Sequence, residues 1–125
     1  MYVIAHAQRP AASLPGIVHQ TLAGRTDGLA HLSVWRQTIA PGAATPPHRH
    51  DCEEVVLVDG GQGALVIDGV AHPFAADSTL VIPPNVDHQI VNTGTVPLAC
   101  TAAFSVSPVA VFLPDGQALD LPWES

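Results

Sequence analysis

The sequence predicts an all-β protein. Twelve Pro and ten Gly residues punctuate the chain and separate short segments that are rich in β-branched residues. Segments of this kind, bounded by turn residues, are typical of strands. No window sustains the apolar i, i+3, i+4, i+7 spacing of an amphipathic helix. The predicted strands cover residues 17–23, 30–39, 53–58, 63–67, 70–74, 79–82, 88–92, 98–105 and 109–113.

Turns and alternation extend this prediction. Asp68-Gly69 joins two strands as a tight hairpin, and residues 59–61 and 114–116 mark further turns. Alternate residues of a strand share a face, and both faces of 53–58 are apolar after the first residue. We expect this strand to be covered on both sides, as in a barrel or sandwich. In 30–39, the mixed polar and aromatic face with Trp35 and Gln37 either contacts solvent or lines a wet cavity. The direction of Arg36, toward the cavity or away from it, is left open.

Length and composition set the domain organisation and the location. With 125 residues, the chain is long enough for one domain, which we place at 1–125. Hydrophobic residues make up 47% of the chain and charged residues 12%, but no apolar run approaches the ~20 residues of a membrane span. The first ten residues show no basic region followed by an apolar region, so no secretory signal is visible. We expect a cytoplasmic protein that does not bind membranes.

The charged residues restrict the possible chemistry. The net charge is −7, with four Arg and no Lys, which excludes lysine Schiff-base catalysis and makes nucleic acid a poor partner. A small molecule or a cation is a more suitable partner for a chain with this negative charge. Seven His stand out because imidazole is the commonest metal ligand. Cys52 and Cys100 are expected to be free thiols.

The main chemical signal is a Pro-rich loop that carries His48 and His50 and leads into a strand at Glu54. On extended backbone, a His-x-His pair places both imidazoles on one side. Glu54 can return an oxygen ligand to the same point, and His88 on another strand can add a third nitrogen. Three imidazoles and one carboxylate suit one divalent transition metal ion, with Fe(II), Mn(II), Ni(II), Cu(II) and Zn(II) all admissible.

These residues resemble the cupins, whose first motif has the order Gly, five residues, His-x-His, three or four residues, Glu, six residues, Gly. Gly42, His48, His50, Glu54 and Gly61 match every position of this motif.

The second cupin motif is matched less completely. Its Pro, His and Asn are present as Pro83, His88 and Asn92, but Asp77 and Asn85 stand where the motif has glycines. Asn tolerates the positive φ that a glycine at 85 would serve. The departure therefore does little harm to the metal assignment.

The resemblance covers residues 30–105 and implies a jelly-roll β-barrel, also called a double-stranded β-helix. It implies that His48, His50, Glu54 and His88 bind one metal, and that the protein is a homodimer. The apolar terminal segments are expected at the dimer interface, because 2–4 and 109–113 are too hydrophobic for free edges.

Such a site fits three functions. In the first, the protein is a dioxygenase-type oxidoreductase acting on a small metal-chelating substrate, with Glu54 as a catalytic base. In the second, it is a metal-dependent isomerase, decarboxylase or lyase acting on a hydroxy acid, a keto acid or a sugar. In the third, it is a cupin that binds a small ligand without catalysis, because fold similarity does not determine the reaction.

Residues beside the four ligands are assigned simpler roles. We expect Arg49 and Glu53 to point away from the metal and Cys52 to be a small buried residue. Asp87 either orients a ligand or faces water. The other four histidines are not expected to be ligands: His6, His19, His31 and His72.

Overall fold

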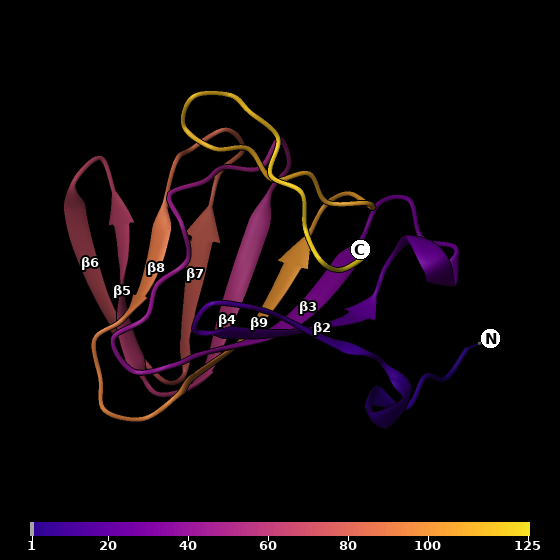
Figure 1. The fold of residues 1–125 in the computed structure, drawn as a ribbon, viewed down its shortest axis with the longest axis horizontal. Coiled ribbons are helices and arrows are strands. Elements are labelled where there is room, and N and C mark those ends of the chain that lie inside the picture. The colour runs from indigo at the N-terminus through magenta and orange to yellow at the C-terminus, as the bar shows by residue number, and fades with distance from the viewer. Residues whose placement is uncertain (1) are drawn as a thin grey trace.

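The computed structural model describes residues 2–125, and Met1 lies outside the described part. The structure consists of two antiparallel sheets (Figure 1). The larger sheet has the strand order β1-β2-β3-β9-β4-β7, and the smaller has the order β6-β5-β8. The strands are β1 (Ala11–Leu14), β2 (Ile17–Ala23), β3 (Ser33–Ile39), β4 (Glu54–Gly60), β5 (Gln62–Ile67), β6 (Val70–Ala75), β7 (Ser78–Ile82), β8 (Gln89–Asn92) and β9 (Leu98–Phe104).

The all-β prediction is confirmed. Within residues 2–125, helical structure is limited to two single turns, η1 (His6–Gln8) and η2 (Arg25–Asp27). None of the described helices is long and apolar enough to cross a membrane. Both sheets contribute to one core, since Leu65 and Ile90 of the smaller sheet pack in the same cluster as residues of the larger sheet.

The predicted strands up to residue 105 are all present, with shifted ends. The largest shift is in 30–39, where the strand begins only at Ser33. The chain also forms β1, which the sequence did not indicate because its four residues alternate weakly. The prediction of a strand at 109–113 is wrong. Only Phe112 forms bridges there, with Arg49 and Ala118, because this segment crosses the structure without running along a strand edge.

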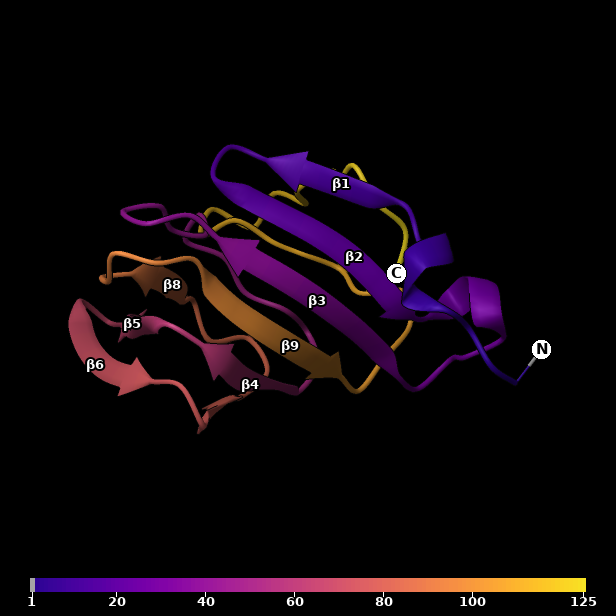
Figure 2. The ribbon, with the colours of Figure 1, turned by 90° about the horizontal axis from the view of Figure 1, so that it is seen from below.

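At β4 the larger sheet is covered on one face only. Along β4, Glu54, Val56 and Val58 face the core, whereas Val55 and Leu57 are 37% and 47% exposed. The expectation that both sides of this strand are covered is therefore wrong. The core lies against the inner face, and no second sheet of the described chain packs on the outer face (Figure 2). The residues around η1 contact the outer face at β2 and β3, through hydrogen bonds with Gln20 and Arg36.

Three turns use the left-handed backbone conformation at residues other than glycine. Asp68 has φ 52°, and with Gly69 at 72° it closes the predicted hairpin between β5 and β6. Asp77 and Asn85 have φ values of 64° and 62°. The two positions where the cupin motif has glycine thus keep positive φ, a conformation that Asp and Asn tolerate better than other residues.

After β9, the chain returns across the structure as residues 106–125, here called the C-terminal segment (Figure 1). Val109 and Val111 are buried, each 6% exposed. Leu121 and Trp123 pack against the core from the same segment. These apolar residues are covered by their own chain, which removes the reason for expecting 109–113 at a subunit interface.

Candidate metal centre

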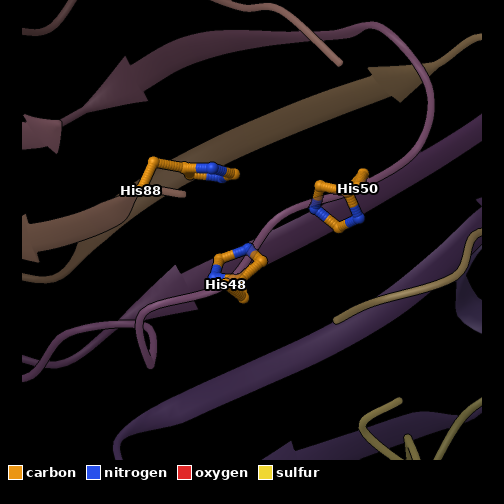
Figure 3. A group of neighbouring side chains, drawn as sticks. All are labelled: His48, His50 and His88. Carbon is orange, nitrogen blue, oxygen red and sulfur yellow. The ribbon is translucent and has the colours of Figure 1, made fainter. Parts of the chain in front are cut away.

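Three histidines meet at one end of the core. His48 and His50 lie in the loop before β4, and His88 immediately precedes β8. The backbones of His48 and His88 pair directly, with N–H···O distances of 3.1 and 2.8 Å. One ligand atom from each of the three imidazoles lies within 4.8 Å of the others, so the group could hold a metal ion (Figure 3).

Backbone carbonyls fix which ring nitrogen faces the centre. Nδ1 of His48 donates to the Pro46 carbonyl at 2.6 Å, and Nδ1 of His88 donates to the Val86 carbonyl at 2.9 Å. Nδ1 of His50 donates to the Ala110 carbonyl at 2.9 Å. A carbonyl can only accept, so each Nδ1 carries a proton, and in the neutral ring it is Nε2 that keeps the lone pair. This is the arrangement by which outer hydrogen bonds orient histidine ligands toward a metal.

Glu54 brings a carboxylate to the same point. Its Oε1 atom lies 3.5 Å from Nε2 of both His50 and His88, and the residue is only 6% exposed. Neither Oε1 of Glu54 nor Nε2 of His88 has a hydrogen-bond partner among the described residues. Buried polar atoms without partners are costly, and a cation bound between them would satisfy both. The donor set therefore fits a divalent metal.

The pKa values of the histidines favour neutral rings at two of the three positions. Burial lowers the pKa of His48 to about 4, and burial also lowers the pKa of His50. Burial acts in the same direction on His88, but the Glu54 carboxylate outweighs it, so the pKa of His88 is raised. Neutral imidazole is the form that binds metal. At neutral pH, His48 and His50 are therefore ready to bind.

His48, His50 and Glu54 line a narrow, largely apolar cavity of about 50 Å³. Its polar wall includes Gln37 and Thr45, and Cys100 also lines it as a buried thiol. Burial raises the pKa of Cys100 to about 11, so it is an uncharged wall residue at neutral pH. The apolar wall comes from both sheets and the C-terminal segment and includes Trp35, Val56, Ile90, Phe104, Leu121 and Trp123.

The residues flanking the ligands lie mostly as expected. Arg49 and Glu53 point away from the histidines, and Cys52 is a buried free thiol. Asp87 is half exposed and accepts a hydrogen bond from Nη1 of Arg49 at 3.1 Å. Asp87 does not orient a histidine ring, because the Nδ1 atoms of the three histidines are already bound to backbone carbonyls. It pairs instead with Arg49, which lies between two of the candidate ligands. Arg36 is exposed on the outer face of β3.

One histidine has a role that the sequence did not indicate. His19 is 1% exposed, and its ring stacks on Trp123 with centroids 3.7 Å apart. Thr21 donates its hydroxyl hydrogen to the Glu124 carbonyl, so it accepts from His19 Nε2 at 2.8 Å. His19 Nδ1 then accepts from the amide of Gln37 at 3.0 Å. This neutral histidine joins the cavity wall to the C-terminal segment.

Comparison with known proteins places the chain in a family. The family model described as auxin binding protein matches residues 3–122. The chain belongs to the auxin-binding protein family. Among its relatives is auxin-binding protein 1 of Arabidopsis thaliana, which is 38% identical over 109 residues. The match covers 79% of the chain and 55% of that relative, so this family member spans only about half of the longer protein.

Solved structures show the same fold. The polyketide cyclase RemF from Streptomyces resistomycificus superposes with a TM-score of 0.74 at 19% identity, covering 99% of this family member and 89% of RemF. An RmlC-like cupin from Shewanella frigidimarina has a TM-score of 0.74 at 22% identity, with coverage of 86% and 93%. The resemblance to cupins and the jelly-roll fold are thereby confirmed. At these identities the likeness concerns the fold alone.

Proposed function

We propose that the chain binds one divalent transition metal ion through His48, His50, Glu54 and His88, and that the ion holds a small organic ligand by its oxygen atoms. The observation that carries the proposal is the convergence of lone-pair Nε2 atoms beside an unpartnered, buried carboxylate oxygen. When bound, the metal supplies Lewis acidity and open positions for an oxygen donor. Ligand types of this kind suit Fe(II), Mn(II), Ni(II), Cu(II) and Zn(II).

The cavity favours a ligand with a carboxylate or similar oxygen group and an apolar body. The oxygen group would face the histidines, and the body would lie against Trp35, Phe104 and Trp123. The Arabidopsis relative is named as an auxin-binding protein. The cavity of about 50 Å³ is far below the ~300 Å³ of ordinary ligand sites, so an aromatic ligand requires a shift of the wall.

Metal binding is tested by loading the chelator-treated protein with Zn(II) or Co(II) and measuring affinity by competition with a chromophoric chelator. The variants Glu54→Gln and His88→Ala should bind more weakly than the wild type. Glu53→Gln is the matched control, because Glu53 is exposed and neighbours Glu54 in the sequence. Equal affinity in Glu54→Gln and Glu53→Gln would remove Glu54 from the ligand set.

Ligand binding is tested by tryptophan fluorescence, since Trp35 and Trp123 both line the cavity. Indole-3-acetate and phenylacetate are suitable probes of the aromatic carboxylate class. We expect both to change the emission of the metal-loaded protein and to have little effect on the metal-free protein. Equal responses with and without metal would contradict ligand binding through the ion.

Catalysis of the dioxygenase type is the second candidate. The observation that favours it is Glu54, a buried carboxylate that can accept a proton from an enol or phenol held beside the histidines. The apolar walls would also limit the access of water to the reacting group. In such a reaction, both atoms of dioxygen enter the organic substrate, and no external reductant is needed.

Assays with and without oxygen separate the remaining possibilities. Consumption of dioxygen by the Fe(II)-loaded protein with a chelating enol or phenol would support the oxidoreductase. Turnover of a hydroxy acid, keto acid or sugar without oxygen would instead indicate an isomerase, decarboxylase or lyase. Metal-dependent ligand binding without turnover in either condition would indicate a binding module.

We further propose a homodimer formed by the outer face of the larger sheet. Strand register places Val81, Val55, Ala103 and Val34 side by side across β7, β4, β9 and β3. Val81 is 69% exposed, so this apolar row faces solvent. An exposed apolar row of this length is typical of an interaction surface.

The charges on the same face suit a second copy of the chain. Arg36 on β3 and Asp59 on β4 lie on opposite sides of β9, because β9 pairs with both strands. A two-fold axis along β9 exchanges β3 of one copy with β4 of the other. Arg36 of each copy would then approach Asp59 of the other, and Val34 would approach Val55. The face is thus complementary to itself.

Light scattering at micromolar concentration tests the dimer. The wild type should have twice the mass of the chain, and Val81→Asp should be monomeric. Val70→Asp is the matched control, because Val70 is 55% exposed on β6 in the other sheet. A monomeric wild type, or a dimer that both variants retain, would contradict this interface.

Location and other partners remain predictions from composition. The net charge of −7 argues against binding to nucleic acid or anionic membranes, which gel-shift and vesicle sedimentation assays would test. The cytoplasmic location is likewise kept as a prediction, to be tested by fractionation of the source cells.

A further inference from the structure

Arg49 makes contacts that the proposed metal chemistry does not use. It lies between His48 and His50, and its side chain points away from them. Its backbone pairs with Phe112 of the C-terminal segment through two hydrogen bonds of 2.9 Å. The guanidinium atom Nη1 donates to Asp87 Oδ1 at 3.1 Å and to the carbonyls of Leu113 and Pro114, both at 3.3 Å.

The groups that Arg49 contacts lie close in sequence to residues that hold a candidate ligand. Asp87 directly precedes His88, so the ion pair with Arg49 holds the turn from which His88 projects. Leu113 lies three residues after Ala110, whose carbonyl orients His50. One side chain therefore connects the loop of two histidines, the turn before the third and the segment that fixes the ring of His50.

We propose that Arg49 is a positioning residue for the metal centre. It acts through Asp87 and the C-terminal segment, which place His88 and the Ala110 carbonyl so that the three Nε2 atoms converge. The inference rests on the proposed metal binding. It assigns a role to a residue that does not touch the ion itself.

The three histidines do not depend equally on Arg49. His48 and His88 pair with each other through their backbones, and each ring binds the carbonyl two residues before it. Local structure thus sets the ring orientation of these two ligands, and Arg49 contributes to the position of His88 only through Asp87. The ring of His50 instead depends on Ala110, which lies 60 residues further along the chain. Loss of Arg49 should therefore disturb His50 first.

The shared donor atom allows a conservative replacement. All three acceptors of the Arg49 side chain are bound by the single nitrogen Nη1. A lysine ammonium also offers several hydrogens from one nitrogen. Arg49→Lys can thus serve the same acceptors, whereas Arg49→Met keeps an aliphatic stem and donates nothing. Arg25→Met is the matched control, since it removes an exposed arginine in η2 that contacts none of the candidate ligands.

The experiment measures Zn(II) affinity by chelator competition and the visible absorption spectrum of the Co(II)-loaded protein. Loss of groups that orient metal ligands typically reduces affinity about 10–100-fold. We expect that loss and a changed Co(II) spectrum for Arg49→Met, with Arg49→Lys and Arg25→Met close to the wild type. Asp87→Asn, which weakens one contact, should fall between the wild type and Arg49→Met.

A change in stability alone would not produce this pattern, because a well-folded fraction would keep the wild-type spectrum. Wild-type affinity and spectrum in Arg49→Met would overturn the inference while leaving metal binding intact. An Arg49→Lys variant as impaired as Arg49→Met would also overturn it. If the wild type itself binds neither Zn(II) nor Co(II), the proposed function fails, and the role of Arg49 fails with it.

Discussion

His19 should make the folded protein sensitive to mild acid. Its ring is buried between Trp35 and Trp123, with both nitrogens used by Thr21 and Gln37. Burial lowers the pKa of His19 from 6.5 to about 4. Protonation would place a hydrogen on Nδ1, where the Gln37 amide already donates. The folded state therefore resists a proton that the unfolded chain accepts.

The sign and size of the effect follow from linkage. Between pH 6.5 and about 4, the unfolded chain binds more protons at His19 than the folded chain does, so stability falls as the pH falls. Above pH 6.5 both states are neutral at this residue, and no penalty exists. The full shift corresponds to about 3 kcal/mol at 1.36 kcal/mol per pKa unit, reached near pH 4.

Urea unfolding of the metal-free protein between pH 7 and pH 4 measures this penalty. The His19→Gln variant should lose less unfolding free energy over that range than the wild type, by about 2–3 kcal/mol. His31→Gln, at an exposed position, is the control for removing one histidine. Parallel curves for the wild type and His19→Gln would refute the reasoning, because another group would then cause the acid sensitivity.

Three further substitutions test the packing. Asn92→Ala removes three side-chain hydrogen bonds to backbone groups, and urea unfolding should show a loss of about 2–4 kcal/mol. Gly63→Ala places a Cβ in steric clash with the Val91 carbonyl oxygen, so the melting temperature should drop; an unchanged value would contradict this close approach. Val56→Ala should cost about 2 kcal/mol because Val56 is 1% exposed, and Val55→Ala on the outer face should cost much less.

The sequence predicts most of the fold because the turn residues and the alternation are local signals. Asp68-Gly69 identifies a hairpin by itself, and the alternation along β4 places Glu54, Val56 and Val58 on one face. The exposure of Val55 and Leu57 could not be predicted, since an apolar residue on a sheet does not reveal whether a second layer exists. The path of residues 109–113 was missed for a similar reason. An apolar segment can be buried by crossing a core as well as by joining a sheet.

The candidate site likewise has a part that the sequence predicts and a part that only the structure reveals. His48, His50, Glu54 and His88 are found from spacing because two short motifs contain them all. The Ala110 carbonyl that orients His50 leaves no trace in the sequence, because every residue has a carbonyl group. The role of His19 depends on Trp123, more than a hundred residues away, and on the course of the C-terminal segment. Such contacts become visible only in three dimensions.

The positive φ values at Asp77 and Asn85 bear on how relatives of this chain can be found. The motif glycines specify a backbone conformation, and Asp and Asn meet that requirement here. A search pattern that demands glycine at these positions would discard this chain although its fold is complete. A pattern that accepts Gly, Asn or Asp there, and keeps the histidines and the glutamate strict, would retain it. Describing a motif by its dihedral angles thus extends its reach to more distant sequences.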